Sequence, residues 1–151
     1  MAMLNIEMLR RQHQDILVWA ANLRGLGGMI QTRDDAWEAR EAISRVDWVL
    51  SDHLRFEDDH LYPALMDCQV PAVAAMALDC AEEMGGLLGA WIAYRNQWTA
   101  SAILADPQRF DAATAGVIGA LVLRIERENT ELYQAASALA FAPIQELYAA
   151  E

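Results

Sequence analysis

Apolar residues recur along the chain at alternating spacings of four and three, which is the period of an amphipathic α-helix. In the first such segment the apolar face includes Leu9, Ile16 and Leu23, and the segment ends at a glycine cluster that begins with Gly25. Short links between long amphipathic helices make sequence neighbours antiparallel. The pattern therefore predicts an all-α, up-down-up-down four-helix bundle, with helices at about residues 5–24, 34–63, 72–100 and 107–135.

Asp34 and Pro71 mark the predicted starts of the second and third helices, as an N-cap and a first-turn residue. The third segment has an unbroken apolar face, so we expect one continuous helix through Gly85 and Gly86. Each glycine inside a helix costs about 1 kcal/mol relative to alanine. The pair is therefore expected to serve close approach of a neighbouring helix or to leave a small space beside it.

The composition fits one globular domain, which we expect to span residues 1–151 with a tail at 138–151 and one helical turn near Gln145–Tyr148. A net charge of −11 without a basic stripe argues against nucleic-acid binding and against an anionic membrane surface. The longest uncharged stretch is shorter than the roughly 20 apolar residues of a membrane-spanning helix. Cys68 and Cys80 lack CxxC spacing, which favours free thiols and a cytoplasmic protein.

An internal repeat relates the second predicted helix to the fourth. Residues 53–65 read HLRFEDDHLYPAL, residues 124–136 read RIERENTELYQAA, and the offset between them is 71. The same offset aligns His13 with Met84, which occupies a core-facing position of the third helix. We therefore expect two related helical hairpins packed about a pseudo-twofold axis. The matched pairs are Glu57 with Glu128, Leu61 with Leu132, Tyr62 with Tyr133 and Ala64 with Ala135.

Five ionisable side chains occupy positions where the pattern calls for apolar ones, and a charge in a bundle core is costly unless it is paired or binds a metal. A histidine and a glutamate four residues apart share one helical face, and facing helices with inward histidines and glutamates build metal sites. Mixed nitrogen and oxygen ligands suit iron, manganese or zinc better than calcium. The five residues are His13, His53, Glu57, Arg124 and Glu128; they lie in the motifs Arg11–Ile16, His53–Asp58 with Leu61–Pro63, and Arg124–Asn129 with Leu132–Tyr133.

With these motifs, residues 5–137 resemble the hemerythrin HHE cation-binding domain. The resemblance implies a four-helix bundle that binds two irons, bridged by two carboxylates and completed by five histidines. It also implies a protein that binds oxygen reversibly, senses oxygen or redox state, or handles iron. By resemblance, His13, His53, Glu57 and Glu128 match the ligands of one iron and both bridging carboxylates.

The family ligands that this sequence lacks are all ligands of the second iron. By the resemblance, that iron would take histidines from the third helix and one from the start of the fourth-helix motif. Residues 72–100 contain no histidine, Met84 stands where one is expected, and Arg124 occupies the fourth-helix position. We therefore expect a single transition-metal ion, iron with manganese or zinc as alternatives, beside Arg124 as a fixed counter-cation. Its expected ligands are His13, His53, Glu57 and Glu128.

A second hypothesis stays open from the sequence: without metal, Arg124 and one protonated histidine would neutralise Glu57 and Glu128, leaving a vestigial site in a structural or interaction protein. His60 is expected at the edge of the bundle, and Met84 as a core gap-filler instead of a ligand. The sequence has no nucleophile–base pair and no phosphate loop. We therefore expect a metal-binding or sensing protein, with dioxygen as a candidate ligand, in preference to an enzyme, and a homodimer as a further alternative.

Overall fold

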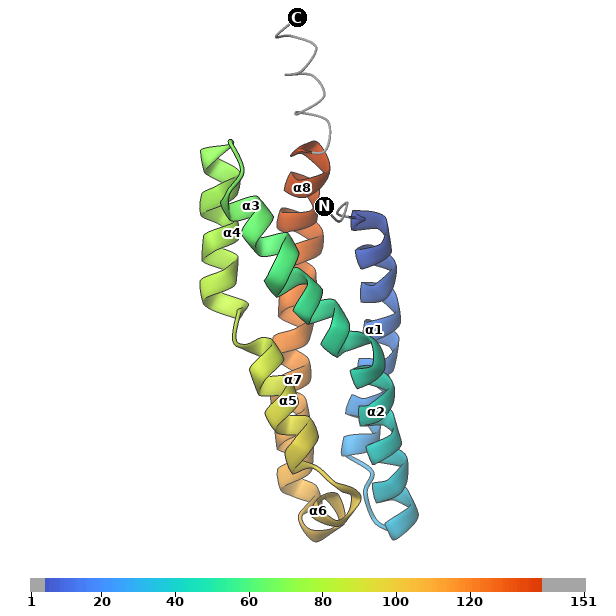
Figure 1. The fold of residues 1–151 in the computed structure, drawn as a ribbon. Coiled ribbons are helices and arrows are strands. Elements are labelled where there is room, and N and C mark those ends of the chain that lie inside the picture. The colour runs from blue at the N-terminus through green and yellow to red at the C-terminus, as the bar shows by residue number, and fades with distance from the viewer. Residues whose placement is uncertain (1–4, 140–151) are drawn as a thin grey trace, which may run out of the picture.

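The computed structural model describes residues 5–139, and within them there is no β-strand (Figure 1). The predicted tail after residue 139, including the turn at Gln145–Tyr148, lies outside the described residues. The helical elements in chain order are α1 (Ile6–Gly27), α2 (Arg33–Phe56), η1 (Glu57–Leu61), α3 (Tyr62–Met66), α4 (Pro71–Met84), α5 (Leu87–Gln97), α6 (Ala100–Ala105), α7 (Pro107–Arg127), η2 (Glu128–Leu132) and α8 (Tyr133–Leu139).

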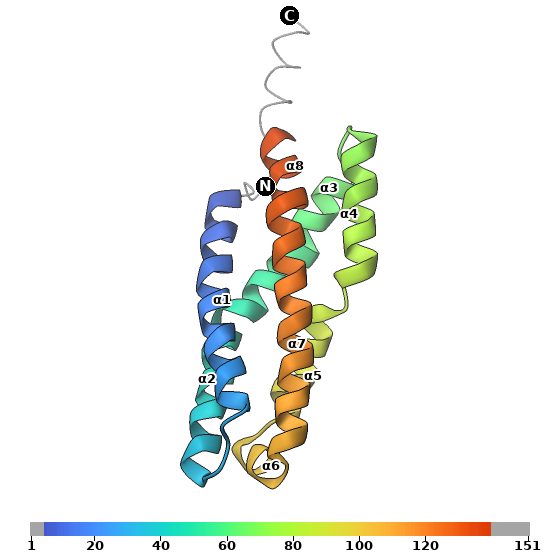
Figure 2. The same ribbon diagram turned by 180° about the vertical axis from the view of Figure 1, so that it is seen from behind.

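Four long helical arms run antiparallel to their sequence neighbours (Figures 1 and 2). They are α1, the arm from α2 through α3, the arm of α4 and α5, and the arm from α7 through α8. α1 packs against both α2 and α7, and α5 packs against α2 and α7. The prediction of an all-α antiparallel four-helix bundle is thereby confirmed. Within residues 5–139, no helix combines the length and the apolar character needed to cross a membrane.

The predicted start of the second helix is wrong by two residues, because Thr32 and not Asp34 is the N-cap of α2. The Thr32 hydroxyl accepts a hydrogen bond from the Asp35 backbone N–H at 3.1 Å, and the Asp35 carboxylate accepts one from the Thr32 N–H at 2.9 Å. This reciprocal capping box satisfies two backbone donors that the helix start leaves free. Thr32 has an extended backbone, so helical geometry begins at Arg33.

The prediction of one continuous third helix is also wrong. The chain breaks at Gly85 and Gly86, so that α4 ends at Met84 and α5 begins at Leu87. A Cβ atom on Gly85 would lie 2.4 Å from the Ala81 carbonyl oxygen, a distance that real Cβ contacts do not reach. Gly85 is therefore required by the path of the backbone at the break, which leaves Met84 as the last residue of a helix.

Two π-helical turns interrupt the second and fourth arms, at Glu57–Leu61 and at Glu128–Leu132. In each turn the backbone N–H of the following tyrosine bonds to the glutamate carbonyl five residues earlier, from Tyr62 to Glu57 and from Tyr133 to Glu128. Turns of this kind are rare and occur frequently at functional sites. Both begin at a glutamate of the internal repeat, so the repeat extends to the backbone geometry.

The apolar core consists of two clusters, with the polar candidates between them. One cluster contains Ile16 on α1 and Leu50 on α2, and the other contains Leu9 on α1 and Leu61 on η1. His13 lies between Leu9 and Ile16 on the same face of α1, and it is 1 % exposed. The two clusters thus keep water away from a polar layer that crosses the middle of the bundle.

Candidate metal centre

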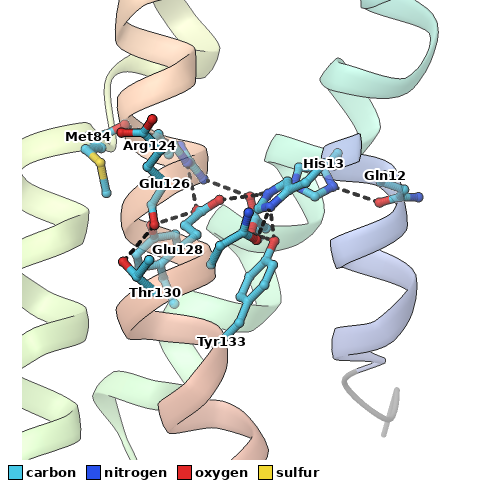
Figure 3. Close-up of polar contacts among 12 residues, drawn as sticks. Gln12, His13, Met84, Arg124, Glu126, Glu128, Thr130 and Tyr133 are labelled. Carbon is cyan, nitrogen blue, oxygen red and sulfur yellow. Dashed lines mark hydrogen bonds and ion pairs between the residues drawn. The ribbon is translucent and has the colours of Figure 1, made fainter. Parts of the chain in front are cut away.

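The polar layer brings together two histidines and two glutamates from four helical elements. His13 lies on α1, His53 on α2, Glu57 at the start of η1 and Glu128 at the start of η2. All four are at most 1 % exposed, and one ligand-type atom from each lies within 4.8 Å of those of the other three. Figure 3 shows Glu128 reaching from the fourth arm toward His13 on α1. Three of the four arms therefore supply side chains to one small volume.

Both histidines are oriented by a hydrogen bond at Nδ1. Nδ1 of His13 lies 2.8 Å from the amide oxygen of Asn129, and Nδ1 of His53 lies 2.7 Å from that of Gln12. An amide oxygen only accepts hydrogen bonds, so each Nδ1 carries the proton and donates it. In the neutral form of each ring, Nε2 then presents its lone pair to the centre. A hydrogen bond on the far nitrogen is how metal-binding histidines are held.

Each Nε2 meets a carboxylate oxygen at short range. Nε2 of His53 lies 3.0 Å from Oε1 of Glu57, and Nε2 of His13 lies 3.1 Å from Oε1 of Glu128. Among residues 5–139, two buried side-chain atoms have no hydrogen-bond partner: Nε2 of His53 and Oε1 of Glu128. Both atoms lie in the same group of ligand-type atoms, within 4.8 Å of one another, where a cation would satisfy both.

The spacing and chemistry of these atoms fit a transition metal. Imidazole nitrogen and carboxylate oxygen bind such ions at about 2.1 Å, so two ligands at right angles lie about 3 Å apart. The two nitrogen–oxygen separations of 3.0 and 3.1 Å match this value. Two nitrogen and two oxygen donors suit iron, manganese or zinc, whereas calcium takes oxygen donors. The residues present therefore fit the metal that the sequence predicts.

Two tyrosines fix the second oxygen of each glutamate. The Tyr133 hydroxyl donates to Oε2 of Glu57 at 2.6 Å, and the Tyr62 hydroxyl donates to Oε2 of Glu128 at 2.8 Å. The Tyr133 oxygen also lies 2.9 Å from Nε2 of His13, with the two rings stacked at 4.9 Å. Each carboxylate is thus held by one oxygen while the other points to the histidines.

Arg124 completes the layer as a buried cation. Its guanidinium donates to Oε2 of Glu128 at 2.9 Å, to Asp58 at 2.9 Å, to Oε1 of Glu57 at 3.4 Å and to the Met84 carbonyl at 3.3 Å. Figure 3 shows Arg124 beside Met84 on one side and Glu128 on the other. A guanidinium has five donors in a planar fork and is always charged. It therefore neutralises part of the carboxylate charge at every pH at which the protein folds.

The electrostatics of the layer follow from burial and from these charges. Burial lowers the pKa of His53 to about 4, opposed by the negative charge of Glu128 and assisted by the positive charge of Arg124. Burial, together with the charge of Glu128, raises the pKa of Glu57. Burial also opposes ionisation of Glu128, but the adjacent His13 and the charge of Arg124 outweigh it and lower the pKa of this carboxyl. His53 is therefore neutral at physiological pH, the form that binds metals.

The structure buries all five polar residues that the sequence places in the core, and it gives two further candidates, His60 and Met84, different positions. His60 is exposed and its ring packs against Phe56 with centroids 5.2 Å apart, so it is at the edge of the bundle as expected. Met84 reaches the layer through its backbone carbonyl, by the hydrogen bond from Arg124. Ligation of a metal by any of these residues stays a prediction.

Five residues of the layer were missed by sequence reasoning, although each lies inside a motif or repeat that the sequence displays. The repeat pairs the two tyrosines, and the two amides are chain neighbours of His13 and Glu128. Their contacts cross from one helix to another, however, and spacing within one helix does not give such contacts. The missed residues are Gln12, Asp58, Tyr62, Asn129 and Tyr133.

Comparison with known proteins gives one informative result. No match was found among curated proteins or among solved structures. The sequence does match the hemerythrin HHE cation binding domain over residues 4–136, which include all five polar core residues and both π-helical turns. This match covers most of the 151 residues. The chain therefore belongs to the hemerythrin HHE cation binding domain family.

Proposed function

We propose that the protein binds one transition-metal ion per chain, iron with manganese or zinc as alternatives, through four buried side chains. The observation that carries this proposal is the orientation of the two histidines, each held at Nδ1 by an amide oxygen and each aiming Nε2 at a glutamate oxygen. Such preorganisation is characteristic of metal sites. The proposed ligands are His13, His53, Glu57 and Glu128.

The test is a metal analysis in which the three histidines act as matched variants. The protein is purified without an affinity tag, and bound metals are counted by elemental analysis. We expect one iron, manganese or zinc ion per wild-type chain, with loss of that ion in His13→Gln and His53→Gln. His60→Gln is the control, because His60 is exposed and outside the layer, and it should retain the ion. Wild-type protein that binds no transition metal after incubation with Fe²⁺, Mn²⁺ or Zn²⁺ would contradict the proposal.

We further propose a role in oxygen or redox sensing or in metal handling, as a cytoplasmic protein. The sensing role requires that the bound iron respond to oxygen, which the ultraviolet–visible spectrum reports when the anaerobic ferrous protein is exposed to air. A spectral change favours sensing or carriage, and a stable ferrous spectrum favours metal handling. Two free cysteines within the described residues, Cys68 and Cys80, support a reducing compartment.

A metal-free structural role is the second candidate, and the contacts of Arg124 favour it. The guanidinium bonds to both glutamates of the layer, so part of their charge is balanced without any metal. Thermal unfolding separates the two functions. A ligand at 100 times its Kd stabilises a protein by about 2.7 kcal/mol, which raises the melting temperature by several degrees in a chain of this size. A melting temperature insensitive to all three metals would favour the structural role.

A further inference from the structure

The candidate centre has an internal twofold relation that the repeat of 71 residues describes. Glu57 and Glu128 begin equivalent π-helical turns, and Tyr62 and Tyr133 follow those turns. Each tyrosine donates to the glutamate of the other half, from Tyr62 to Glu128 and from Tyr133 to Glu57. The two halves therefore supply the same carboxylate and phenol groups to a shared centre.

The halves differ in the residues that face those carboxylates. The offset of 71 relates His53 to Arg124 and His13 to Met84. In the first half an imidazole lies 3.0 Å from its own glutamate, from His53 to Glu57. In the second half a guanidinium lies 2.9 Å from its own glutamate, from Arg124 to Glu128. Equivalent positions thus hold a neutral metal-type ligand in one half and a permanent cation in the other.

We propose that the Arg124 guanidinium takes the place of a second metal ion, so that the centre holds one metal and one built-in organic cation. This inference rests on the proposed function, since it concerns the half of the centre that supplies only Glu128 to the proposed metal. By the internal symmetry, Arg124 stands toward Glu128 as His53 stands toward Glu57, but it brings a positive charge of its own where His53 offers a lone pair for a metal. Arg124 sets the number of metal ions that the chain binds.

The contacts of Arg124 are those of a substitute cation. Its nitrogens reach three carboxylates, those of Glu57, Asp58 and Glu128, and also the Met84 carbonyl. A divalent ion and a guanidinium supply three positive charges, which equals the negative charge of these three carboxylates when all are ionised. The Met84 carbonyl ends α4, where the last carbonyls of a helix lack partners and carry partial negative charge.

The oxygens that a second metal would use are already engaged. Oε2 of Glu128 accepts from both Arg124 and Tyr62, at 2.9 and 2.8 Å. Oε2 of Glu57 accepts from Tyr133 at 2.6 Å. A second ion would have to displace these donors and approach a guanidinium that is 1 % exposed. Like charges in a poorly hydrated interior repel strongly, so no second metal ion binds beside the guanidinium.

The test is anaerobic titration of the metal-free protein with Fe²⁺, followed by calorimetry and by elemental analysis of the desalted protein. Wild type should bind one ion. Arg124→Lys keeps the charge and should also bind one. Arg124→Gln removes the charge, and it should bind Fe²⁺ at least tenfold more tightly or bind a second ion, because the repulsion is gone. Arg127→Gln is the control, since Arg127 pairs with Glu83 and Glu131 near the surface; it should match wild type.

The outcomes separate this inference from the proposed function. Wild type and Arg127→Gln that bind no Fe²⁺ would contradict the proposed function itself. Wild type that binds two ions, or Arg124→Gln that binds one ion with equal or weaker affinity, would overturn the role of Arg124 while leaving a metal site. If Arg124→Gln does not fold without metal, circular dichroism replaces the affinity measurement. Fe²⁺ should then restore its helix content, and a failure to do so would overturn the inference.

Discussion

The first hairpin (α1 and the second arm) and the second hairpin (the third and fourth arms) contribute different groups to the centre, although the repeat relates them. In the first hairpin α1 passes the centre as one continuous helix, and His13 points from its face. In the second hairpin the equivalent position is Met84, where α4 ends and the chain breaks. One hairpin therefore offers a side chain from an intact helix, and the other offers a backbone carbonyl from a helix end.

Backbone continuity determines which group of each hairpin can interact with a cation at the centre. Within an intact helix the backbone carbonyls are engaged, so the helix interacts with the centre through side chains alone. A helix end has free carbonyls, and Arg124 donates to the one at Met84. The helix break at Gly85 thus leaves an acceptor that Arg124 uses. Three predictions test the two halves of the centre and the helix break, and a fourth gives a reference outside the centre; they are ordered by the size of the expected loss of stability.

Removal of the guanidinium should have the largest effect on stability. Arg124→Ala leaves two buried carboxylates without their cation, and the free energy of unfolding should fall by about 3–5 kcal/mol in the absence of metal. Arg127→Ala is the matched control three residues away, where a partly exposed pair contributes at most about 1 kcal/mol. Urea unfolding of both variants measures the difference. A loss below about 1 kcal/mol for Arg124→Ala would show that the second half needs no cation.

The tyrosine pair compares the two carboxylates directly. Tyr133→Phe removes the hydroxyl that donates to Oε2 of Glu57. The free energy of unfolding should fall by about 2 kcal/mol, because a buried acceptor loses its partner. Tyr62→Phe should cost only about 1 kcal/mol, because Oε2 of Glu128 keeps its hydrogen bond from Arg124. Thermal unfolding of the metal-free variants gives the ranking. Equal losses would mean that Arg124 does not support Glu128 more than Glu57.

The helix break is tested by two neighbouring glycines. Gly85→Ala places a Cβ against the Ala81 carbonyl, and the backbone shift should cost about 1–2 kcal/mol. A Cβ on Gly86 meets no atom within 4 Å, so Gly86→Ala should be neutral or stabilising by up to about 1 kcal/mol. Urea unfolding measures both variants. The prediction fails if the two alanines have the same effect.

Asp47 provides a reference outside the centre. Its carboxylate accepts from Trp91 and Arg95 at 2.8 and 2.9 Å. Burial alone would raise its pKa, but hydrogen bonds from Ser51 and Trp91 and the charge of Arg95 outweigh burial and lower it. A lowered pKa gives stability above the ordinary carboxyl pKa that is lost as the pH falls through the lowered value.

Asp47→Asn should therefore be less stable than wild type by about 1 kcal/mol at neutral pH. The difference should shrink as the pH falls below the ordinary carboxyl pKa of about 3.9, because Asp47 of the unfolded chain becomes protonated there and Asp47 of the folded protein follows at its lowered pKa. Urea unfolding at several pH values measures it. A difference that grows on acidification would show that the sign of the pKa shift is wrong.

The sequence was sufficient to predict which charged side chains occupy core-facing positions. A charged residue such as Arg124 or Glu128 on a core-facing position is visible from spacing alone, and so are the four helical segments. The antiparallel bundle follows from these segments and their short links. The family match over residues 4–136 agrees with the resemblance drawn from the motifs.

The sequence was insufficient where tertiary contacts decide the geometry. The break at Gly85 was missed because the apolar spacing continues across it, from Met84 to Leu87 and Trp91. The amides that hold the histidines, Gln12 and Asn129, belong to different helices from the rings that they contact. Periodicity describes which face of a helix is buried, whereas it does not specify which residue on a neighbouring helix lies opposite.

The two π-helical turns have a consequence for the number of residues in each arm. Each residue of an α-helix rotates the chain by about 100° and advances it by about 1.5 Å. Deleting one residue from Glu57–Leu61 to restore α-helical geometry would leave Tyr62 only four places after Glu57. The tyrosine side chain would then point in a different direction from the helix axis relative to the glutamate side chain. Chain length between glutamate and tyrosine is thus as much a determinant of this centre as the two side chains, and the fourth arm preserves the same count from Glu128 to Tyr133.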